Sequence, residues 1–221
     1  MAIPVLIIGK SGSGKSASMK GCVGKDFNLI RVLNKPLPFR GKINGWVTDD
    51  YQTVFKALRC APAKSIVIDD AGYLITNYFM RNHSVKGKGN DVFGLYNILG
   101  DNFWNLIEYI IKQVPADKIV YVTMHEDVDD AGNIKAKTIG KLLDEKICLE
   151  GMFTIVLRCV NNLTEHKFLT QSDGTAISKS PEGMFEDIEI PNDLLYVDNK
   201  IREYYEIPNE KNKESEEMKN D

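Results

Sequence analysis

Ile3-Pro-Val-Leu-Ile-Ile-Gly9-Lys-Ser-Gly-Ser-Gly14-Lys15-Ser16, near the start of the chain, is the stretch that decides the fold. Its first part, Ile3 to Ile8, is a continuous apolar run that ends at Gly9. Such a run is typical of a central strand in a parallel sheet, because helices cover both faces of that strand. The glycines that follow indicate a tight loop, and we expect a helix to begin near Lys15. A strand, a loop and a helix in this order predict an α/β fold.

The loop from Gly9 to Ser16 matches the pattern G-x-x-x-x-G-K-[ST]. Its glycines let the chain wrap tightly, so that consecutive backbone N–H groups point at phosphate oxygens. Lys15 is expected to reach the β- and γ-phosphates of a nucleoside triphosphate, and the Ser16 hydroxyl to bind Mg²⁺. The predicted nucleotide-binding residues are Gly9, Lys10, Ser11, Gly12, Ser13, Gly14, Lys15 and Ser16. The alternative is a glycine-rich turn that binds no ligand.

A second apolar run, Ser65-Ile-Val-Ile68, ends in the two carboxylates Asp69 and Asp70. Ligands of open α/β sheets bind at the carboxyl ends of the strands, where this run would deliver Asp69. Asp69 is therefore predicted to hold Mg²⁺, directly or through water. Asp70 is the first candidate for orienting or deprotonating the attacking water. Its alternative role is the N-cap of a helix starting at Ala71.

The nucleotide expected at this site is ATP. Asp69-x-x-Gly72 also fits a motif of GTPases, but those enzymes recognise guanine through N-K-x-D after a later strand. The Asn34-Lys35 pair lacks the aspartate and follows the second expected strand, which is predicted over 27–33. The sequence therefore favours ATP with Mg²⁺ over GTP.

A later strand, predicted from Ile119 to Met124, ends in polar residues. In P-loop ATPases with an additional strand between the loop strand and the Mg²⁺-aspartate strand, the tip of that strand senses the γ-phosphate. Thr123, His125 and Glu126 are the candidates, and a solvated or capping histidine is the alternative for His125. The predicted catalytic residues are Lys15, Asp70, His125 and Glu126.

The rest of the chain alternates between strand and helix patterns, which predicts a mainly parallel sheet with helices on both faces. A fifth strand is expected over 153–160, with an antiparallel partner over 165–171. Helices are expected over about 50–60, 71–81 and 92–114, and after Asn192. We expect one domain over residues 1–207. Residues 208–221 are almost entirely polar and predict a disordered tail.

Composition narrows the possible partners. The 221 residues carry a net charge of −3, so contact with nucleic acid would need a local basic patch. No apolar run approaches the about 20 residues of a membrane span, and no export signal is present. Of the four cysteines, no two have C-x-x-C spacing, so neither a zinc site nor a redox pair is suggested. We therefore expect a cytoplasmic protein with reduced thiols and no membrane partner.

The sequence resembles phage-type RecA-like ATPases, which are often described only as AAA proteins. The resemblance rests on segments 9–16, 32–39, 65–70, 139–153 and 179–185. It implies a RecA-like P-loop core and, for a phage-encoded protein, a location in the host cytoplasm. It also implies a homo-oligomer, as a ring or filament, with ATP between subunits. Lys141, Arg158 and Lys179 are the candidates for basic residues that reach a neighbouring subunit's γ-phosphate.

The resemblance further implies a role in DNA recombination or single-strand annealing, with single-stranded DNA as a partner. Candidate DNA-binding loops are Glu126–Lys141, Gln171–Ser180 and the Lys86-Gly-Lys88-Gly segment. RecA-like enzymes usually carry a catalytic glutamate where this chain has Asn34 and Lys35, so we expect slow hydrolysis. The alternatives are a helicase-loader-type DNA motor, an assembly switch that ATP controls with little hydrolysis, and a P-loop kinase for a small substrate.

Overall fold

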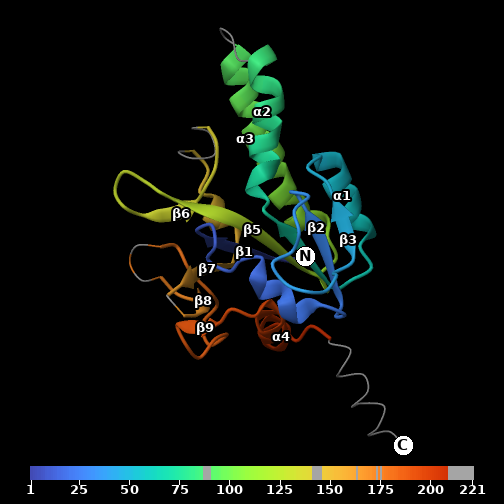
Figure 1. Ribbon diagram of the computed structural model, residues 1–221, viewed down its shortest axis with the longest axis vertical. Helices are drawn as coiled ribbons and strands as arrows, with labels where there is room; N and C mark the ends of the chain where they lie inside the picture. The colour runs from blue at the N-terminus through green and yellow to red at the C-terminus, as the bar shows by residue number, and fades with distance from the viewer. Residues whose placement is uncertain (87–90, 141–145, 163, 173, 175, 209–221) are drawn as a thin grey trace, which may run out of the picture.

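The centre of the molecule is a sheet to which nine strands in the described residues contribute (Figure 1). The computed structural model describes residues 1–86, 91–140, 146–162, 164–172, 174 and 176–208. The strands are β1 (Ile3–Gly9), β2 (Phe27–Arg31), β3 (Gly45–Val47), β4 (Ser65–Asp69), β5 (Ile119–Val128), β6 (Ile134–Ala136), β7 (Ile155–Asn161), β8 (His166–Leu169) and β9 (Glu189–Pro191).

The strand order is β3-β2-β4-β5-β1-β7-β8-β9, with β6 paired to β5. The six strands from β3 to β7 along this order are parallel, and β8 and β9 continue the sheet antiparallel. β5 therefore lies between the loop strand β1 and the aspartate strand β4. This order confirms the predicted α/β fold, with a mainly parallel sheet and an antiparallel extension after the fifth expected strand.

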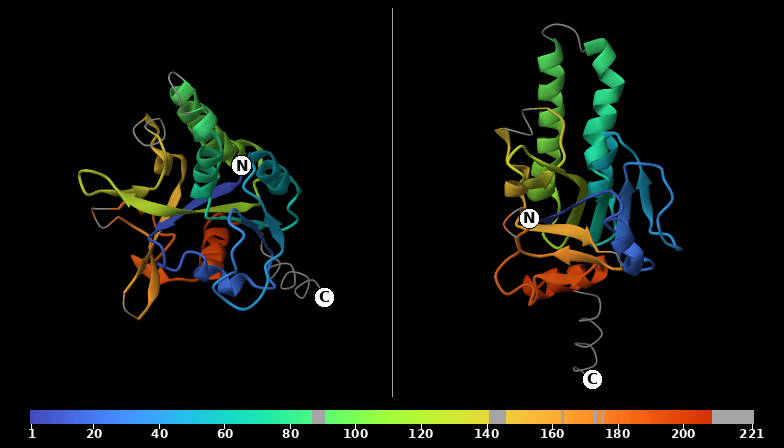
Figure 2. Two further views of the ribbon diagram at one scale, coloured as in Figure 1. Left: turned by 45° about the horizontal axis from the view of Figure 1, so that its top comes forward. Right: turned by 60° about the vertical axis from the view of Figure 1, so that its left-hand side comes forward.

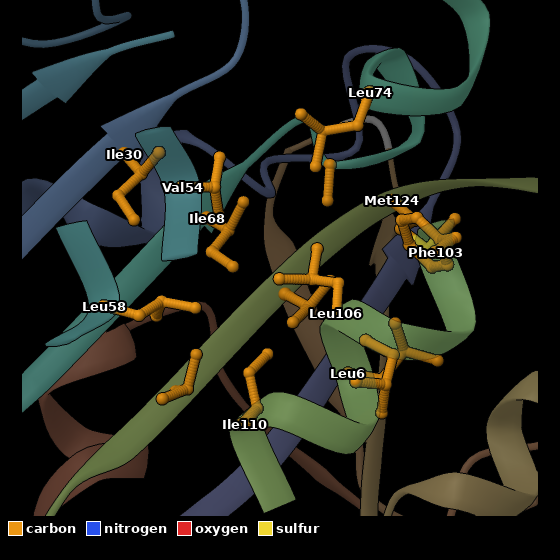
Figure 3. Close-up of a cluster of buried hydrophobic side chains, with 14 of the residues drawn as sticks. Leu6, Ile30, Val54, Leu58, Ile68, Leu74, Phe103, Leu106, Ile110 and Met124 are labelled. Carbon is orange, nitrogen blue, oxygen red and sulfur yellow. The ribbon is translucent and has the colours of Figure 1, made fainter. Parts of the chain in front are cut away.

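Helices cover both faces of the sheet and create two apolar cores. One face carries α1 (Tyr51–Cys60), α2 (Gly72–Lys86) and α3 (Asp91–Gln113); the other carries the 3₁₀ segment η1 (Ala17–Cys22) and α4 (Leu194–Tyr204). Along β1, Leu6 and Ile8 enter the first core while Val5 and Ile7 enter the second, because side chains alternate between the faces of a strand. Figure 3 shows the first core, where side chains from the sheet meet those of the three helices.

α2 and α3 pack side by side and extend well beyond the body of the molecule (Figure 2). The outer part of the pair exposes apolar side chains, with Phe93 73% and Met80 58% accessible. The segment Lys86-Gly-Lys88-Gly, predicted as a DNA-binding loop, begins at the last residue of α2 and otherwise lies outside the described residues.

The helix expected to begin near Lys15 is replaced by the six-residue 3₁₀ segment η1. Ser16 precedes η1 and provides no side-chain cap, since its hydroxyl is turned toward β4. The Ser18 hydroxyl donates to the Lys15 carbonyl at 2.6 Å, and such local bonds compete with an α-helix. Gly21 and Gly24 add two of the weakest helix-forming residues. The predicted helix is therefore present only as a short 3₁₀ segment, which begins at Ala17.

The remaining expectations were mostly correct. The Asp50 carboxylate caps α1 by accepting from Thr53 N, and β8 pairs antiparallel with β7 as expected. The sequence did not predict the three-residue strands β3, β6 and β9, nor the 3₁₀ segment η3 (Leu149–Met152). These elements are too short for a hydrophobic period to be visible.

A buried polar network attaches α4 to the start of β4. Asp198 of α4 accepts hydrogen bonds from the Ser65 hydroxyl and, at 2.9 Å, from the Tyr121 hydroxyl. Arg202, one turn further along α4, donates from Nε to Asp198 at 2.7 Å and from Nη2 to Ser65 at 2.7 Å. The Asp198 and Arg202 side chains are both only 4% exposed, so this ion pair is enclosed in the protein.

Within the described residues, none of the helices combines the length and apolar character needed to cross a membrane. The single domain over residues 1–207 stays a prediction. The predicted tail, apart from Pro208, lies outside the described residues.

Candidate nucleotide-binding site

The predicted phosphate loop and the predicted polar strand ends meet at one edge of the sheet. Gly9, the last residue of β1, is opposite His125 in the register of β1 with β5. Ile68 is opposite Val122, which places Asp69 and Thr123 side by side at the ends of β4 and β5. Because parallel strands present their carboxyl ends at the same edge, residues more than 50 positions apart in the sequence converge here.

Two glycines of the loop lie where the Cβ of any other residue would be too close to neighbouring atoms. A Cβ at Gly9 would lie 2.5 Å from Ser13 Oγ and 2.6 Å from the Cys159 carbonyl oxygen. Gly14 has φ +106°, and a Cβ there would lie 2.8 Å from the His166 ring. The loop is therefore packed closely against β7 and β8, while Lys10, Ser11 and Gly12 are exposed on its outer side.

The Ser13 carbonyl is held from two strands. The Cys159 thiol of β7 donates to it at 2.9 Å, and His166 Nδ1 of β8 is 2.8 Å away. Burial raises the pKa of Cys159 to about 11, so the thiol stays protonated and can donate. The Ser13 hydroxyl is itself buried and has no hydrogen-bond partner among the described residues. No local sequence signal pointed to these contacts of Cys159 and His166, which lie about 150 residues from the loop.

Lys15 lies folded over the start of the loop. Its ammonium donates to the Gly9 carbonyl at 2.7 Å and the Lys10 carbonyl at 2.9 Å, and Nζ is 3.5 Å from His125 Nδ1. The residue is only 5% exposed, and burial lowers the pKa of its side chain below the usual value. A partly desolvated ammonium that faces the loop interacts strongly with an anion placed there.

Ser16 and Asp69 face each other across the site. The Ser16 hydroxyl is 3.0 Å from both carboxylate oxygens of Asp69, and Thr123 Oγ1 donates to Asp69 Oδ1 at 2.9 Å. Burial and the neighbouring Asp70 raise the pKa of Asp69 above its usual value. Bound Mg²⁺ would supply the positive charge that this carboxylate lacks.

The oxygen ligands at this position fit Mg²⁺. Mg²⁺ is commonly bound by one or two carboxylates together with substrate phosphates and water, and Ser16 and Asp69 offer a hydroxyl and a carboxylate. Within the described part of the chain, no cluster of three or more His, Cys, Asp or Glu side chains could hold a metal without such additional ligands. The pair therefore suits a metal that arrives with a phosphate group.

Asp70 has an unusual backbone conformation and lies close to a lysine and a histidine. Its φ of +59° lies in the left-handed region, which non-glycine residues rarely adopt. Its side chain is 3% exposed; Oδ2 forms an ion pair with the Lys35 ammonium, and Oδ1 is 3.8 Å from His125 Nε2. The position of Asp70 fits the predicted contact with a reacting water, and Lys35 compensates its charge. The role of Asp70 in catalysis stays a prediction.

His125 and Glu126 differ in their surroundings. Burial and the Lys15 charge lower the pKa of His125, so the ring is neutral near pH 7. Glu126 receives two hydrogen bonds from Arg158, Nε to Oε2 at 2.9 Å and Nη2 to Oε1 at 3.2 Å. This two-point contact lies within one chain, whereas the sequence suggested that Arg158 reaches a neighbouring subunit. The catalytic roles of His125 and Glu126 stay predictions.

Lys179 and Lys141 were the other basic residues predicted to reach a neighbouring subunit, and that role stays a prediction for both. Lys179 exchanges two backbone hydrogen bonds with Val156, at 2.8 and 2.9 Å, which places it beside β7. Lys141 lies outside the described residues. Besides those of Cys159 and His166, the contact that Lys35 makes in the site was also not predicted from the sequence. The signal was its location just after β2, because the end of β2 pairs with the end of β4.

The comparisons with known proteins do not identify a family for this chain. No family model matches the chain, and no curated protein matches it. Among solved structures, a KaiC-like protein from the hyperthermophilic archaeon Pyrococcus horikoshii OT3 is similar, with a TM-score of 0.44 and 10% sequence identity. The match covers 81% of this chain and 83% of that chain. The candidate nucleotide site therefore rests on the loop, the strand order and the contacts described above.

Proposed function

We propose that this protein binds ATP together with Mg²⁺ at the loop 9–16 and hydrolyses it slowly. The observation that carries the proposal is the approach of the Ser16 hydroxyl to both oxygens of Asp69, at 3.0 Å, beside the buried ammonium of Lys15. One strand end thus supplies a phosphate-binding loop, and the end of another supplies a metal-binding carboxylate.

Each described residue of the site then has a defined task. The backbone N–H groups of the loop bind phosphate oxygens, and Lys15 moves from the loop carbonyls to the β- and γ-phosphates. Ser16 and Asp69 hold Mg²⁺, which lowers the cost of gathering negative charge on the phosphates. Thr123 keeps the Asp69 carboxylate oriented through its hydrogen bond of 2.9 Å.

Slow turnover is expected because the carboxylates near the phosphate position are already paired. Asp70 contacts Lys35, and Glu126 is held by Arg158. A paired carboxylate must separate from its cation before it can accept a hydrogen bond from the attacking water, and that separation costs free energy. This arrangement also favours the second candidate function, an assembly switch in which ATP binding matters more than hydrolysis.

We further propose that the ATPase acts on single-stranded DNA in recombination or annealing of a phage-like kind, as a ring or filament. Two of the predicted DNA loops adjoin, because Ile134 of β6 forms a bridge with Ala176. A groove of about 510 Å³ between α1 and α3 also combines aromatic and basic side chains, among them Phe55, Tyr109, Lys56, Arg59 and Lys112. Rings and cations together suit unpaired bases and their phosphates.

The test is ATP hydrolysis by the purified protein with and without single-stranded DNA. Lys15→Ala should remove turnover, whereas Lys20→Ala, an exposed lysine of η1, serves as the matched control and should retain it. Stimulation by DNA would support the role in DNA metabolism. ATP binding with slow turnover that DNA does not change would favour the assembly switch. Wild-type turnover in Lys15→Ala would disprove the proposed site.

A further inference from the structure

The contact between Lys35 and Asp70 joins two strand connections at the candidate site. Lys35 follows β2 by four residues, and Asp70 follows β4 directly. The two strands are in register at their ends, with Arg31 opposite Asp69. The ion pair therefore closes the edge of the site next to the predicted metal ligand.

The backbone of Lys35 is held in place while its side chain is free to move. Arg31 Nη1 donates to the Lys35 carbonyl at 3.2 Å, and the Lys35 N–H donates to the Leu33 carbonyl at 2.9 Å. Pro36 follows and restricts Lys35 to extended backbone conformations. The Lys35 side chain nevertheless remains 51% exposed, so its four methylenes can change rotamer at little cost.

The charges around this pair make a second arrangement accessible. Asp69 and Asp70 are adjacent and buried, and each raises the electrostatic attraction for a cation. Burial disfavours the charged Lys35, but its contact with Asp70 and the charges of Asp70 and Asp69 outweigh this and raise its pKa. Lys35 thus stays an ammonium beside Asp70, whose other carboxylate oxygen is 3.8 Å from His125, and the His125 ring is in turn 3.5 Å from the Lys15 ammonium.

We propose that Lys35 senses the γ-phosphate within its own subunit. Its ammonium pairs with Asp70 when no γ-phosphate is present, and moves to the γ-phosphate when ATP binds. This inference rests on the proposed function. A triphosphate carries more negative charge than one carboxylate, so it attracts the Lys35 ammonium more strongly. Mg²⁺ bound to Asp69 would then compensate the negative charge of the two adjacent aspartates in place of Lys35. The movement leaves Asp70 as an unpaired acceptor for the attacking water.

The consequence is that the site distinguishes ATP from ADP through one lysine. ADP has no γ-phosphate, so Lys35 remains on Asp70 and makes no contact with the nucleotide. Asp70 lies two residues before Gly72, the first residue of α2. Movement of Lys35 from Asp70 to the γ-phosphate therefore also changes the net charge next to the N-terminus of α2. No role in contacting the nucleotide was assigned to Lys35 from the sequence.

The experiment measures the affinities for Mg²⁺–ATP and Mg²⁺–ADP of the full chain, by calorimetry. Lys35→Ala should weaken ATP binding about tenfold, the effect of losing one charged hydrogen bond, and change ADP binding less than about twofold. Lys35→Arg should restore most of the difference. Lys42→Ala, an exposed lysine in the same connection, is the matched control and should change neither affinity.

If Lys35→Ala does not fold, Asp70→Asn tests the same proposal independently. Removal of the competing carboxylate should tighten ATP binding more than ADP binding. Equal effects on both nucleotides in Lys35→Ala, or no effect on either, would overturn the role of Lys35 while leaving the nucleotide site intact. Failure of the wild-type protein to bind either nucleotide would overturn the proposed function itself, and the inference with it.

Discussion

β4 connects two buried polar networks that are built in different ways. At its first residue, Ser65 joins Asp198, Arg202 and Tyr121 in a network whose ion pair is 4% exposed on both sides. At its other end, Asp69 and Asp70 lie next to each other, and the Lys35 cation that approaches Asp70 is half exposed. In the first network the polar groups pair with one another inside the protein. In the second, the two carboxylates of Asp69 and Asp70 are adjacent, and the backbone of Asp70 is strained.

The difference indicates that the network around Asp198 stabilises the fold and that the charges at Asp69 and Asp70 suit the binding of a ligand. An enclosed ion pair whose partners are all hydrogen-bonded is costly to break, because the remaining charge cannot reach water. Adjacent carboxylates and a left-handed φ at Asp70 cost free energy in the protein alone. Such strain and like-charge crowding are typical of functional sites, where bound ligands compensate them.

The same chemical change in both networks should produce the largest contrast. Asp198→Asn leaves Arg202 without its counterion and is expected to reduce the free energy of unfolding by about 3–5 kcal/mol. Asp70→Asn removes the repulsion with Asp69 and frees a lysine that water can solvate, so stability should change by less than about 1 kcal/mol. Urea unfolding measures both. Equal losses would contradict the proposed division of roles.

Removal of the Tyr121 hydroxyl tests whether the stability of the Asp198 network depends on each of its hydrogen bonds. Burial raises the pKa of Tyr121 well above its usual value, so the phenol stays protonated and donates to Asp198. Tyr121→Phe should therefore cost about 1.5–3 kcal/mol, as expected for a buried hydrogen bond to a charged group. Tyr109→Phe, at a partly exposed ring, is the control. A loss below that of the control would show that the network tolerates missing members.

The site should respond to acid through His125, with a smaller effect. Its pKa is lowered from 6.5 in the folded protein, chiefly by burial, while an unfolded chain titrates near the ordinary value. Below pH 6.5 the unfolded state therefore binds more protons, and wild-type stability falls as the pH decreases toward the folded pKa. His125→Gln lacks this dependence, so its stability relative to wild type should rise on acidification. Parallel pH profiles from urea unfolding would contradict this assignment.

An exposed ion pair should have the smallest effect of all. The Lys64 and Asp117 side chains are 47% and 44% exposed, so water screens their interaction. Lys64→Ala is expected to change the free energy of unfolding by about 0–1 kcal/mol, measured in the same urea series. A loss comparable to that of Asp198→Asn would mean that enclosure is not what separates the strong ion pair from the weak one.

Parts of the site that lie within one segment were predictable, and parts that join distant segments were not. The loop 9–16 and Asp69 were identified because a glycine pattern and an apolar run ending in Asp are local signals. The contacts of Lys35 with Asp70 and of Arg158 with Glu126 join residues 35 and 32 positions apart, across neighbouring or next-neighbour strands. Their pairing depends on strand order, which no local pattern contains.

The sequence by itself determined the α/β fold, the glycine-rich loop after the first strand and the apolar strands of the sheet, because hydrophobic period and glycine placement act over a few residues. Only the tertiary structure decided that the loop continues into a 3₁₀ segment, that Cys159 and His166 hold the Ser13 carbonyl, and that Lys35 compensates Asp70. Each of these outcomes depends on which strand ends meet at the carboxyl edge of the sheet. Charge, burial and hydrogen bonding at that edge arise from neighbours in space, so they exist only once the sheet has formed.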